Sequence, residues 1–218
     1  MHADSAPSPW FTRFAAMVQP EARLLDLACG RGRHARFFAA RGARVTAVDR
    51  DASALAALHG VPGVAILEAD LEGGPWPLAG ERFDAIVVAN YLHRPLFAPL
   101  ATALAPAGVL LYETFARGNE AYGRPSNPDF LLAPGELLQA FAGLRVVAFE
   151  DGFESEPARF VQRLAAVARA APPPARYGLG VVAFEQGRVE AAGRTAVVQR
   201  LAAVGPAHPW PPAIPAAN

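Results

Sequence analysis

Three features of the sequence predict a doubly wound α/β fold with a mostly parallel sheet. Short apolar runs alternate with amphipathic runs between residues 10 and 150, a glycine-rich turn follows the first apolar run, and acidic residues end three successive runs. Strands that alternate with helices place those helices on both faces of a parallel sheet. Such sheets bind ligands at the carboxyl ends of their strands, near the point where the strand order reverses.

The predicted elements follow from hydrophobic periodicity. The six short apolar runs predict strands at residues 23–28, 43–48, 64–69, 84–89, 109–114 and 144–150. The intervening runs predict helices at residues 10–18, 33–40, 52–58, 95–104 and 134–141, with Pro95 suited to a first helical turn. The long polar segment 115–132 is expected to be a loop, and long loops in compact domains are often functional.

Composition excludes several classes of protein. The chain of 218 residues is 52% hydrophobic and 18% charged, as expected of a folded globular protein. Its 20 basic and 20 acidic residues give a formal net charge of +0, so we expect neither nucleic acid nor an anionic membrane as a partner. No run offers the roughly 18 uncharged apolar residues of a membrane span. We predict no metal site.

The amino-terminal segment and the cysteine content predict the compartment. MHADSAPSPW lacks the basic and apolar regions of a secretory signal. Cys29 is the only cysteine, so an intrachain disulfide cannot form. We therefore expect a cytoplasmic location.

Two blocks of sequence occur twice in the same order. VVAFEDG at 146–152 nearly recurs as VVAFEQG at 181–187, and VQRLAAV at 161–167 recurs identically at 198–204. The proline-rich stretch 170–176 joins the copies and is expected to be a stiff linker. We interpret the blocks as a duplicated β-hairpin, of which one copy completes the main sheet. The other is expected to extend the sheet edge or to pair with a second chain, which makes a homodimer as well as a monomer plausible.

The stretch DLACGRGRH, which begins at Asp26, indicates a nucleotide-type ligand. Gly30 and Gly32 permit a tight turn and a close approach of the backbone to a ligand, and the following helix directs its first amides there. A dinucleotide fingerprint would place a pyrophosphate at this turn. The carboxylate of Asp26 would repel a pyrophosphate and would accept hydrogen bonds from an ammonium group. The stretch therefore favours a cationic, adenosine-like ligand over NAD.

Two further acids end the next two predicted strands. Asp49 stands 17 residues after Gly32, where a carboxylate can accept hydrogen bonds from both hydroxyls of a ribose. Asp70 is expected to meet the exocyclic amine of an adenine. Acids also cap helices and end strands for structural reasons, but three at successive strand ends indicate a binding site.

With these residues, the sequence resembles the class I S-adenosylmethionine-dependent methyltransferases. DLACGRGRH, VTAVDRD, EADLE and DAIVVANYLHRPLF carry the resemblance, which covers about residues 10–167. YETFARGNEAYGRPSNPDFLLAPGEL is similar to the tellurite-resistance methyltransferase-like branch. The resemblance implies a Rossmann-like sheet of order 3-2-1-4-5-7-6 with its last pair antiparallel, and S-adenosyl-L-methionine as cofactor. It also implies a division into a methyltransferase domain (1–170), a linker with the second hairpin (171–204) and a proline-rich tail (205–218).

The resemblance also implies roles for individual residues. The methionine part would be held by Asp26, the turn from Ala28 through Cys29 and Gly30 to Gly32, and His34. The ribose and adenine would be bound by Asp49, Arg50, Asp70 and Leu71. Asn90 would face the sulfonium, and Tyr91 would wall the methyl group.

Methyl transfer from a sulfonium needs little acid–base chemistry, because the leaving group carries its own activation and orientation supplies most of the acceleration. His93 is a candidate base for an acceptor that must lose a proton, or else a structural histidine at a helix start. Arg94, Glu113, Tyr122 and Trp10 are candidates to line the pocket of a small-molecule acceptor. Cys29 is expected to be a small buried residue rather than a nucleophile.

Other functions stay open on the sequence. The chain could act on RNA or protein, although no basic run with aromatic residues supports this. It could also bind the cofactor or its demethylated product without catalysis, as a regulatory module. An NAD-dependent dehydrogenase is disfavoured by Asp26.

Overall fold

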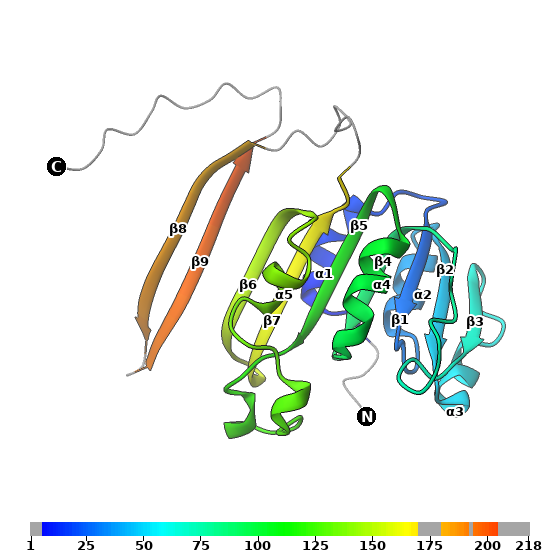
Figure 1. Cartoon of the computed structure of the whole chain (residues 1–218), viewed down its shortest axis with the longest axis horizontal. Helices are drawn as coiled ribbons and strands as arrows, with labels where there is room; N and C mark the ends of the chain where they lie inside the picture. Colours follow the sequence, from blue (N-terminus) through cyan, green and yellow to red (C-terminus); the bar gives the residue numbers. More distant parts are fainter. Residues whose placement is uncertain (1–5, 170–179, 192–193, 205–218) are drawn as a thin grey trace.

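The computed structural model describes residues 6–169, 180–191 and 194–204, with side chains described in the first of these ranges (Figure 1). The strands are β1 (Arg23–Leu27), β2 (Arg44–Asp49), β3 (Val64–Glu68), β4 (Phe83–Ala89), β5 (Leu104–Phe115), β6 (Arg145–Ser155), β7 (Ala158–Val167), β8 (Gly180–Ala191) and β9 (Arg194–Val204). The α-helices are α1 (Pro9–Phe14), α2 (Arg33–Ala39), α3 (Ala52–Leu55), α4 (Phe97–Ala103) and α5 (Glu136–Ala140). Short 3₁₀ turns are η2 (Ala15–Met17), η3 (Ala56–Leu58), η4 (Arg94–Leu96), η5 (Asn119–Ala121) and η6 (Pro128–Phe130).

Seven strands form one sheet in the order β3-β2-β1-β4-β5-β7-β6. Neighbouring strands from β3 to β5 are parallel, and β7 runs antiparallel to both β5 and β6. The strand order reverses between β1 and β4, which lie side by side in the middle of the sheet. The predicted order and the antiparallel last pair are therefore confirmed. A crevice at the carboxyl ends of β1 and β4 is the expected ligand position in such a sheet.

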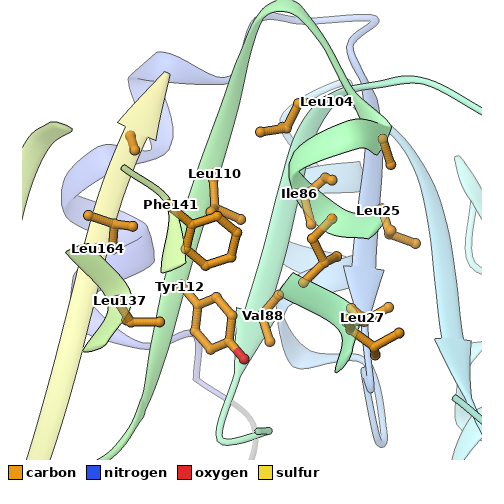
Figure 2. Packing of buried hydrophobic residues seen from close by; sticks show 14 of the residues in the cluster. Leu25, Leu27, Ile86, Val88, Leu104, Leu110, Tyr112, Leu137, Phe141 and Leu164 are labelled. Carbon is orange, nitrogen blue, oxygen red and sulfur yellow. The ribbon is translucent and has the colours of Figure 1, made fainter. Parts of the chain in front are cut away.

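Each face of the sheet carries its own hydrophobic core. Figure 2 shows the core on the face covered by α4 and α5, where Phe141 and Tyr112 lie next to each other between Leu164 on one side and Val88 on the other. The opposite core packs Phe11 of α1 and Phe38 of α2 against apolar residues of the central strands. Central strands buried on both faces explain the nearly continuous apolar runs in the sequence.

Several boundaries differ from the predicted ones. The predicted third strand ends at Glu68, before Asp70, and the helix predicted at 95–104 is divided into η4 and α4 and ends at Ala103. β5 begins at Leu104, five residues earlier than predicted, with a left-handed residue at Ala107 and a shifted register to β4. β6 continues to Ser155 because its second half pairs with β7 along a long hairpin. These differences reflect tertiary pairing, which periodicity does not report.

Both copies of the duplicated sequence form hairpins, as predicted. β6 and β7 complete the main sheet, whereas β8 and β9 form a separate two-stranded sheet. β9 lies beside β6 (Figure 1), but β8 and β9 pair only with each other among the described strands. Among the described strands, no ladder joins the second copy to the main sheet, and extension of the sheet edge by this copy stays a prediction. The alternative, pairing with a second chain, stays a prediction.

In the described ranges, no helix is long and apolar enough to cross a membrane.

The core around Phe141 yields a stability prediction. Its ring packs against Phe97 and Tyr112, with centroids 5.4 and 6.1 Å away, and is 2% exposed. We expect Phe141→Ala to lower the free energy of unfolding by about 3–5 kcal/mol, because the cavity adds to the lost burial. The matched control is Phe130→Ala, whose ring is 49% exposed and which should cost less than about 0.5 kcal/mol. Urea unfolding measures both, and equal losses would contradict this packing.

Candidate functional site

The turn that follows β1 has a left-handed backbone at three nearby residues. Ala28, Gly30 and Gly32 have φ of 52°, 54° and 74°. Gly32 precedes α2 as its N-cap, and a Cβ there would overlap the side chain of Leu58. A Cβ at Gly30 would meet no atom within 4 Å, so its backbone faces open space. The glycine pair thus shapes the turn at Gly32 and leaves room for a ligand at Gly30.

Asp26 is a buried carboxylate beside this turn. It is 1% exposed, and its Oδ2 has no hydrogen-bond partner among the described residues. Burial raises the pKa of Asp26 from 3.8 to about 7, although the Ala35 amide and the Arg33 guanidinium oppose the shift. A buried acceptor without a partner is costly. A ligand that brings a cationic donor would supply the missing hydrogen bond.

Asp49 ties the second strand to the turn. Its Oδ2 accepts a hydrogen bond from the Gly30 amide at 2.7 Å, and its Oδ1 accepts one from the Asp51 amide at 2.9 Å. A carboxylate accepts about four hydrogen bonds in all, so both oxygens keep acceptor capacity. The two amides fix the orientation of the carboxylate, and Asp49 lines the cavity described below.

Asp70 lies on the loop after β3. Its Oδ1 accepts a hydrogen bond from the Glu72 amide at 2.9 Å. The amides of Glu72 and Gly73, with Arg50 and His93 nearby, hold the pKa of Asp70 below its usual value. Asp70 therefore stays ionised at neutral pH. The neighbouring Leu71 is 7% exposed and adds an apolar wall.

Asn90 and Tyr91 follow β4. Asn90 has a left-handed backbone, with φ of 55°, and its amide donates to the Glu113 carbonyl oxygen at 2.8 Å. Tyr112 Oη donates to the Tyr91 carbonyl oxygen at 2.9 Å. The Tyr91 hydroxyl is buried next to the Glu72 carboxylate. Burial and the nearby Glu72 carboxylate raise the pKa of Tyr91, which keeps the hydroxyl protonated.

These residues line two adjoining cavities that share Ala28 and Asn90. The first has a volume of about 280 Å³ and is lined by Ala28, Asp49, Arg50, Ala69, Asp70, Leu71, Glu72, Asn90 and Tyr91. The second has a volume of about 340 Å³ and is lined by Asp26, Ala28, Cys29, Gly30, Arg31, Arg33, His34, Ala89 and Asn90. Of the residues predicted to bind the cofactor, all but Gly32 line one cavity or the other, together with Tyr91.

His34 and Cys29 of the second cavity are electrically neutral at pH 7. Burial lowers the pKa of His34 from 6.5 to about 3, and its Nε2 accepts a hydrogen bond from the Ser8 amide at 3.1 Å. Burial and the carboxylates of Asp26 and Asp49 raise the pKa of the Cys29 thiol. A thiol in this environment is a weak nucleophile. The second cavity is therefore a place for binding rather than for covalent chemistry by Cys29.

Glu113 belongs to a buried polar network that is linked to the second cavity through Ser8 and His34. Its Oε2 accepts hydrogen bonds from Ser8 Oγ at 3.0 Å and from Arg163 Nε at 2.5 Å. Arg163 also donates to Glu150 and Glu154. Glu113 Oε1 is buried with no described hydrogen-bond partner. The network anchors the start of α1 to β5 and β7.

The other predicted acceptor residues do not gather at one point. Trp10 is 3% exposed and packs edge-on against Phe14, with its Nε1 unpaired within the described ranges. Tyr122 is 38% exposed and lies against Phe153 and Phe160. Trp10 and Tyr122 line neither of the two cavities.

Arg94 and His93 lie beyond the first cavity. The Arg94 guanidinium donates to both carboxylate oxygens of Glu136 and to the carbonyl oxygens of Asp129 and Leu131. These contacts fasten the 117–131 segment to α5 and occupy the guanidinium. His93 is half-buried, precedes η4 as its N-cap and lines neither cavity, although it contributes to the low pKa of Asp70.

Known proteins share this arrangement of strands. The structure of TehB from Haemophilus influenzae has a TM-score of 0.61 at 17% identity, over 78% of this chain and 63% of that chain. An S-adenosylmethionine-dependent methyltransferase from Mesorhizobium loti gives 0.58 at 19% identity, over 73% and 98% of the two chains. The chain has the class I methyltransferase fold. It spans less than two thirds of the TehB chain.

Comparison of the sequence itself finds a similarity over the middle of the chain. Residues 24–108 match the model of a family described as methyltransferase domain. This range holds nearly all of β1 to β4 and all the residues that line the two cavities. The search of curated proteins found no match.

Some site residues were not predicted. Arg33, Ala69, Glu72 and Ala89 line the cavities, and the available signal was that each stands next to a predicted residue in the sequence. Ser8 and Arg163 join Glu113 from segments 105 and 50 residues away in the sequence. No local pattern indicates such a network. In the ranges with described side chains, no cluster of three His, Cys, Asp or Glu residues could hold a metal ion.

Asp26 makes the stability of the ligand-free protein pH-dependent. Its pKa in the folded state is raised to about 7 from 3.8, so the folded state binds the proton more tightly than the unfolded state. Stability is therefore greatest below about pH 4 for this group, and it falls as the pH rises towards 7, by about 4 kcal/mol.

Asp26→Asn should remove this contribution. We expect the ligand-free variant to melt several degrees higher than the parent protein at pH 8, with a much smaller difference at pH 5. Calorimetry at the two pH values measures it. Asp84→Asn, at the opposite end of the sheet, is the control that should not change the pH dependence. A constant difference between parent and Asp26→Asn would contradict the raised pKa.

Gly32 yields a second prediction for the turn. Gly32→Ala should destabilise the protein by about 1–3 kcal/mol, because alanine disfavours φ of 74° and its Cβ overlaps Leu58. Gly143→Ala is the matched control, since Gly143 has no positive φ and a Cβ added there would meet no atom within 4 Å. Chemical denaturation compares the two, and similar midpoints would show that the turn relaxes.

Proposed function

We propose that the chain is an S-adenosyl-L-methionine-dependent methyltransferase that transfers a methyl group to a small-molecule acceptor. One observation carries the proposal: the buried carboxylate of Asp26, whose Oδ2 has no partner among the described residues, stands beside a glycine turn, and Asp49 at the end of β2 and Asp70 on the loop after β3 line the adjoining cavity. A cationic amino-acid part beside Asp26 and a nucleoside beside the other two acids suit this arrangement. A pyrophosphate, with its negative charges, does not.

The comparisons support S-adenosyl-L-methionine as the cofactor. Residues 24–108 match a methyltransferase domain, and the Mesorhizobium loti neighbour is described as dependent on S-adenosylmethionine. A coclaurine N-methyltransferase, bound to N-methylheliamine and S-adenosylhomocysteine, has a TM-score of 0.53 at 19% identity, over 64% of this chain and 48% of that chain. The residues fit the cofactor, since Asp26 Oδ2 needs a donor and the Gly30 backbone faces open space.

The proposed binding roles divide between the two cavities. In the second cavity, Asp26, Ala28, Cys29, Gly30 and His34 would hold the methionine part, with Asp26 accepting from its ammonium group. In the first, Asp49 would accept hydrogen bonds from the ribose hydroxyls, and Arg50, Asp70 and Leu71 would hold the adenine. Gly32 contributes through the shape of the turn. Asn90 is common to both cavities, which suits a position beside the sulfonium.

The bound cofactor supplies a methyl group already activated by a sulfonium. The chain's residues then need to orient the acceptor and exclude water, because alignment of the reacting atoms supplies most of the acceleration. The protonated Tyr91 hydroxyl would form a wall beside the methyl group and donate a hydrogen bond to an acceptor. His93, two residues further along the chain, is the proposed base for an acceptor that must lose a proton.

The acceptor is proposed to be a small molecule, with thiols, selenite, tellurite, organic acids and amines as the classes to test. Glu113, Tyr122 and Trp10 stay proposed acceptor contacts. For Arg94 we propose the positioning of the 117–131 segment, since its donors already serve Glu136 and two carbonyl oxygens. The tellurite-resistance-like branch stays a prediction, because 17% identity to TehB supports the fold alone. We propose residues 1–170 as the catalytic domain.

Cofactor binding tests the proposal directly. We expect S-adenosylmethionine and S-adenosylhomocysteine to raise the melting temperature, because each binds only the folded chain. Asp49→Ala should weaken S-adenosylhomocysteine binding about 100-fold in calorimetry, since charged hydrogen bonds to two hydroxyls are lost. Asp84→Ala removes a carboxylate that also accepts from a backbone amide, that of Arg23, at the opposite end of the sheet. It should bind as the parent does.

Three results would change the proposal. Tight binding of NADH would overturn the choice of cofactor. Equal weakening by Asp49→Ala and Asp84→Ala would overturn the location of the ribose. Binding of S-adenosylmethionine without formation of S-adenosylhomocysteine across thiol, oxyanion, acid and amine acceptors would favour a regulatory module over an enzyme.

A further inference from the structure

The two hairpins share backbone pairing as well as sequence. In β6–β7, Phe149 pairs with Leu164 and Glu150 with Arg163. In β8–β9, the corresponding residues pair in the same way, Phe184 with Leu201 and Glu185 with Arg200. The register also shifts at the same place, between Val146 and Ala148 in the first hairpin and between Val181 and Ala183 in the second. The second hairpin thus has the register and the bulge of the first.

The identical block is the part of β7 that builds the main sheet. β7 pairs with β5 through Val161–Val167, from Phe115↔Val161 to Val109↔Val167. The same seven letters, VQRLAAV, occupy 198–204 in β9. β9 pairs with β8 on one side, and its other edge lies beside β6 without a ladder between them. The edge of β9 that faces away from β8 therefore has the same sequence as the edge of β7 that pairs with β5.

We propose that the β8–β9 hairpin is an interchangeable copy of β6–β7 and can take its place on β5 within the same chain. The order of the copies permits this exchange without threading. The first strands of the two copies are 35 residues apart (146 to 181). If the second copy docked on β5, the first copy and the linker would form a loop between α5 and β8, and β5 and α5 would keep their places. Loop closure costs rise only slowly with length, and the linked copy is present at a high effective concentration.

The contacts that hold β7 have counterparts at the register positions of β9. Arg163 donates to Glu113, and Gln162 accepts from the Leu137 amide and donates to the Ala133 carbonyl oxygen. Arg200 and Gln199 stand at the corresponding positions. The exchanged hairpin therefore carries the residue types of these contacts, whereas Asp151, which accepts a hydrogen bond from the Gly135 amide before α5, has Gln186 as its counterpart.

The copies differ towards the tips of the hairpins. Phe160, Phe153 and Glu154 of the first copy correspond to Val197, Arg188 and Val189 of the second. In the present arrangement, Tyr122 lies against Phe153 and Phe160, and Glu154 pairs with Arg163 and Arg159. These contacts favour the first copy on β5. The exchange would replace the aromatic wall beside Tyr122 by an arginine and a valine, and so change the surroundings of the 117–131 segment.

The first test places a charged residue at the same core position of each hairpin, in the full-length chain. Leu164 is fully buried in the core shown in Figure 2. The Leu164→Asp variant should still unfold cooperatively, at a melting temperature below that of the parent, because the second copy then pairs with β5. Leu201→Asp should melt within about 2 °C of the parent, and the double variant should show no cooperative melt, as expected when a charge is forced into a core. The exchange is overturned if Leu164→Asp and the double variant both lack cooperative unfolding. It is equally overturned if both unfold cooperatively at the same temperature.

The second test traps the exchanged pairing. Phe115→Cys with Val161→Cys joins partners of the present sheet and is the positive control. In the Leu164→Asp background, Phe115→Cys with Val198→Cys should form a disulfide within one chain, seen by peptide mapping and monomer mobility on non-reducing gels. Phe115→Cys with Thr195→Cys is the out-of-register control and should stay reduced. A disulfide between two chains would assign the second hairpin to a neighbouring copy and overturn exchange within the chain, as would no disulfide at all.

Discussion

The hydrogen bond from the Gly30 amide to Asp49 is the contact on which the crevice depends. It joins the turn after β1 to the end of β2, and the same carboxylate holds the Asp51 amide at the start of α3. The turn needs left-handed backbone at Ala28, Gly30 and Gly32, which alanine adopts at a cost. A fixed carboxylate offsets part of that cost. The two cavities lie on either side of this contact and share the residues next to it.

Asp26 shows how binding and stability oppose each other at such a site. A buried carboxylate with one oxygen unpaired among the described residues weakens the folded chain, yet the same oxygen would provide selectivity for a cationic donor. His34 and Cys29 beside it carry no charge at neutral pH, so the field in the second cavity is set by Asp26, Asp49 and the two arginines of the turn. Binding of a cationic group would favour the ionised form of Asp26.

The alternation of strands and helices and the crevice at the strand ends could be predicted because their signals are local, whereas the strand order was implied by the resemblance to a known family. Each of Asp26, Asp49 and Asp70 lies within, ends or follows an apolar run, and parallel strands bring their carboxyl ends to one edge. The network of Ser8, Glu113 and Arg163 could not be predicted, because its members come from the start of α1, β5 and β7. The long β5 and β6 were also missed, since their added residues are held by pairing with neighbours rather than by their own periodicity. Glu113, one of the proposed acceptor residues, belongs to this network.

The same network has a consequence for how the protein is made. Ser8 caps α1, but its Oγ donates to Glu113, which is held by Arg163 of β7. During synthesis, α1 leaves the ribosome about 150 residues before Arg163 does, at rates of roughly 5–20 residues per second. For that interval of several seconds, the apolar face of α1 with Phe11 has no completed sheet to cover it. The main sheet can be completed only after β7 has been made, and until then Ser8 lacks the Glu113–Arg163 pair that anchors the start of α1.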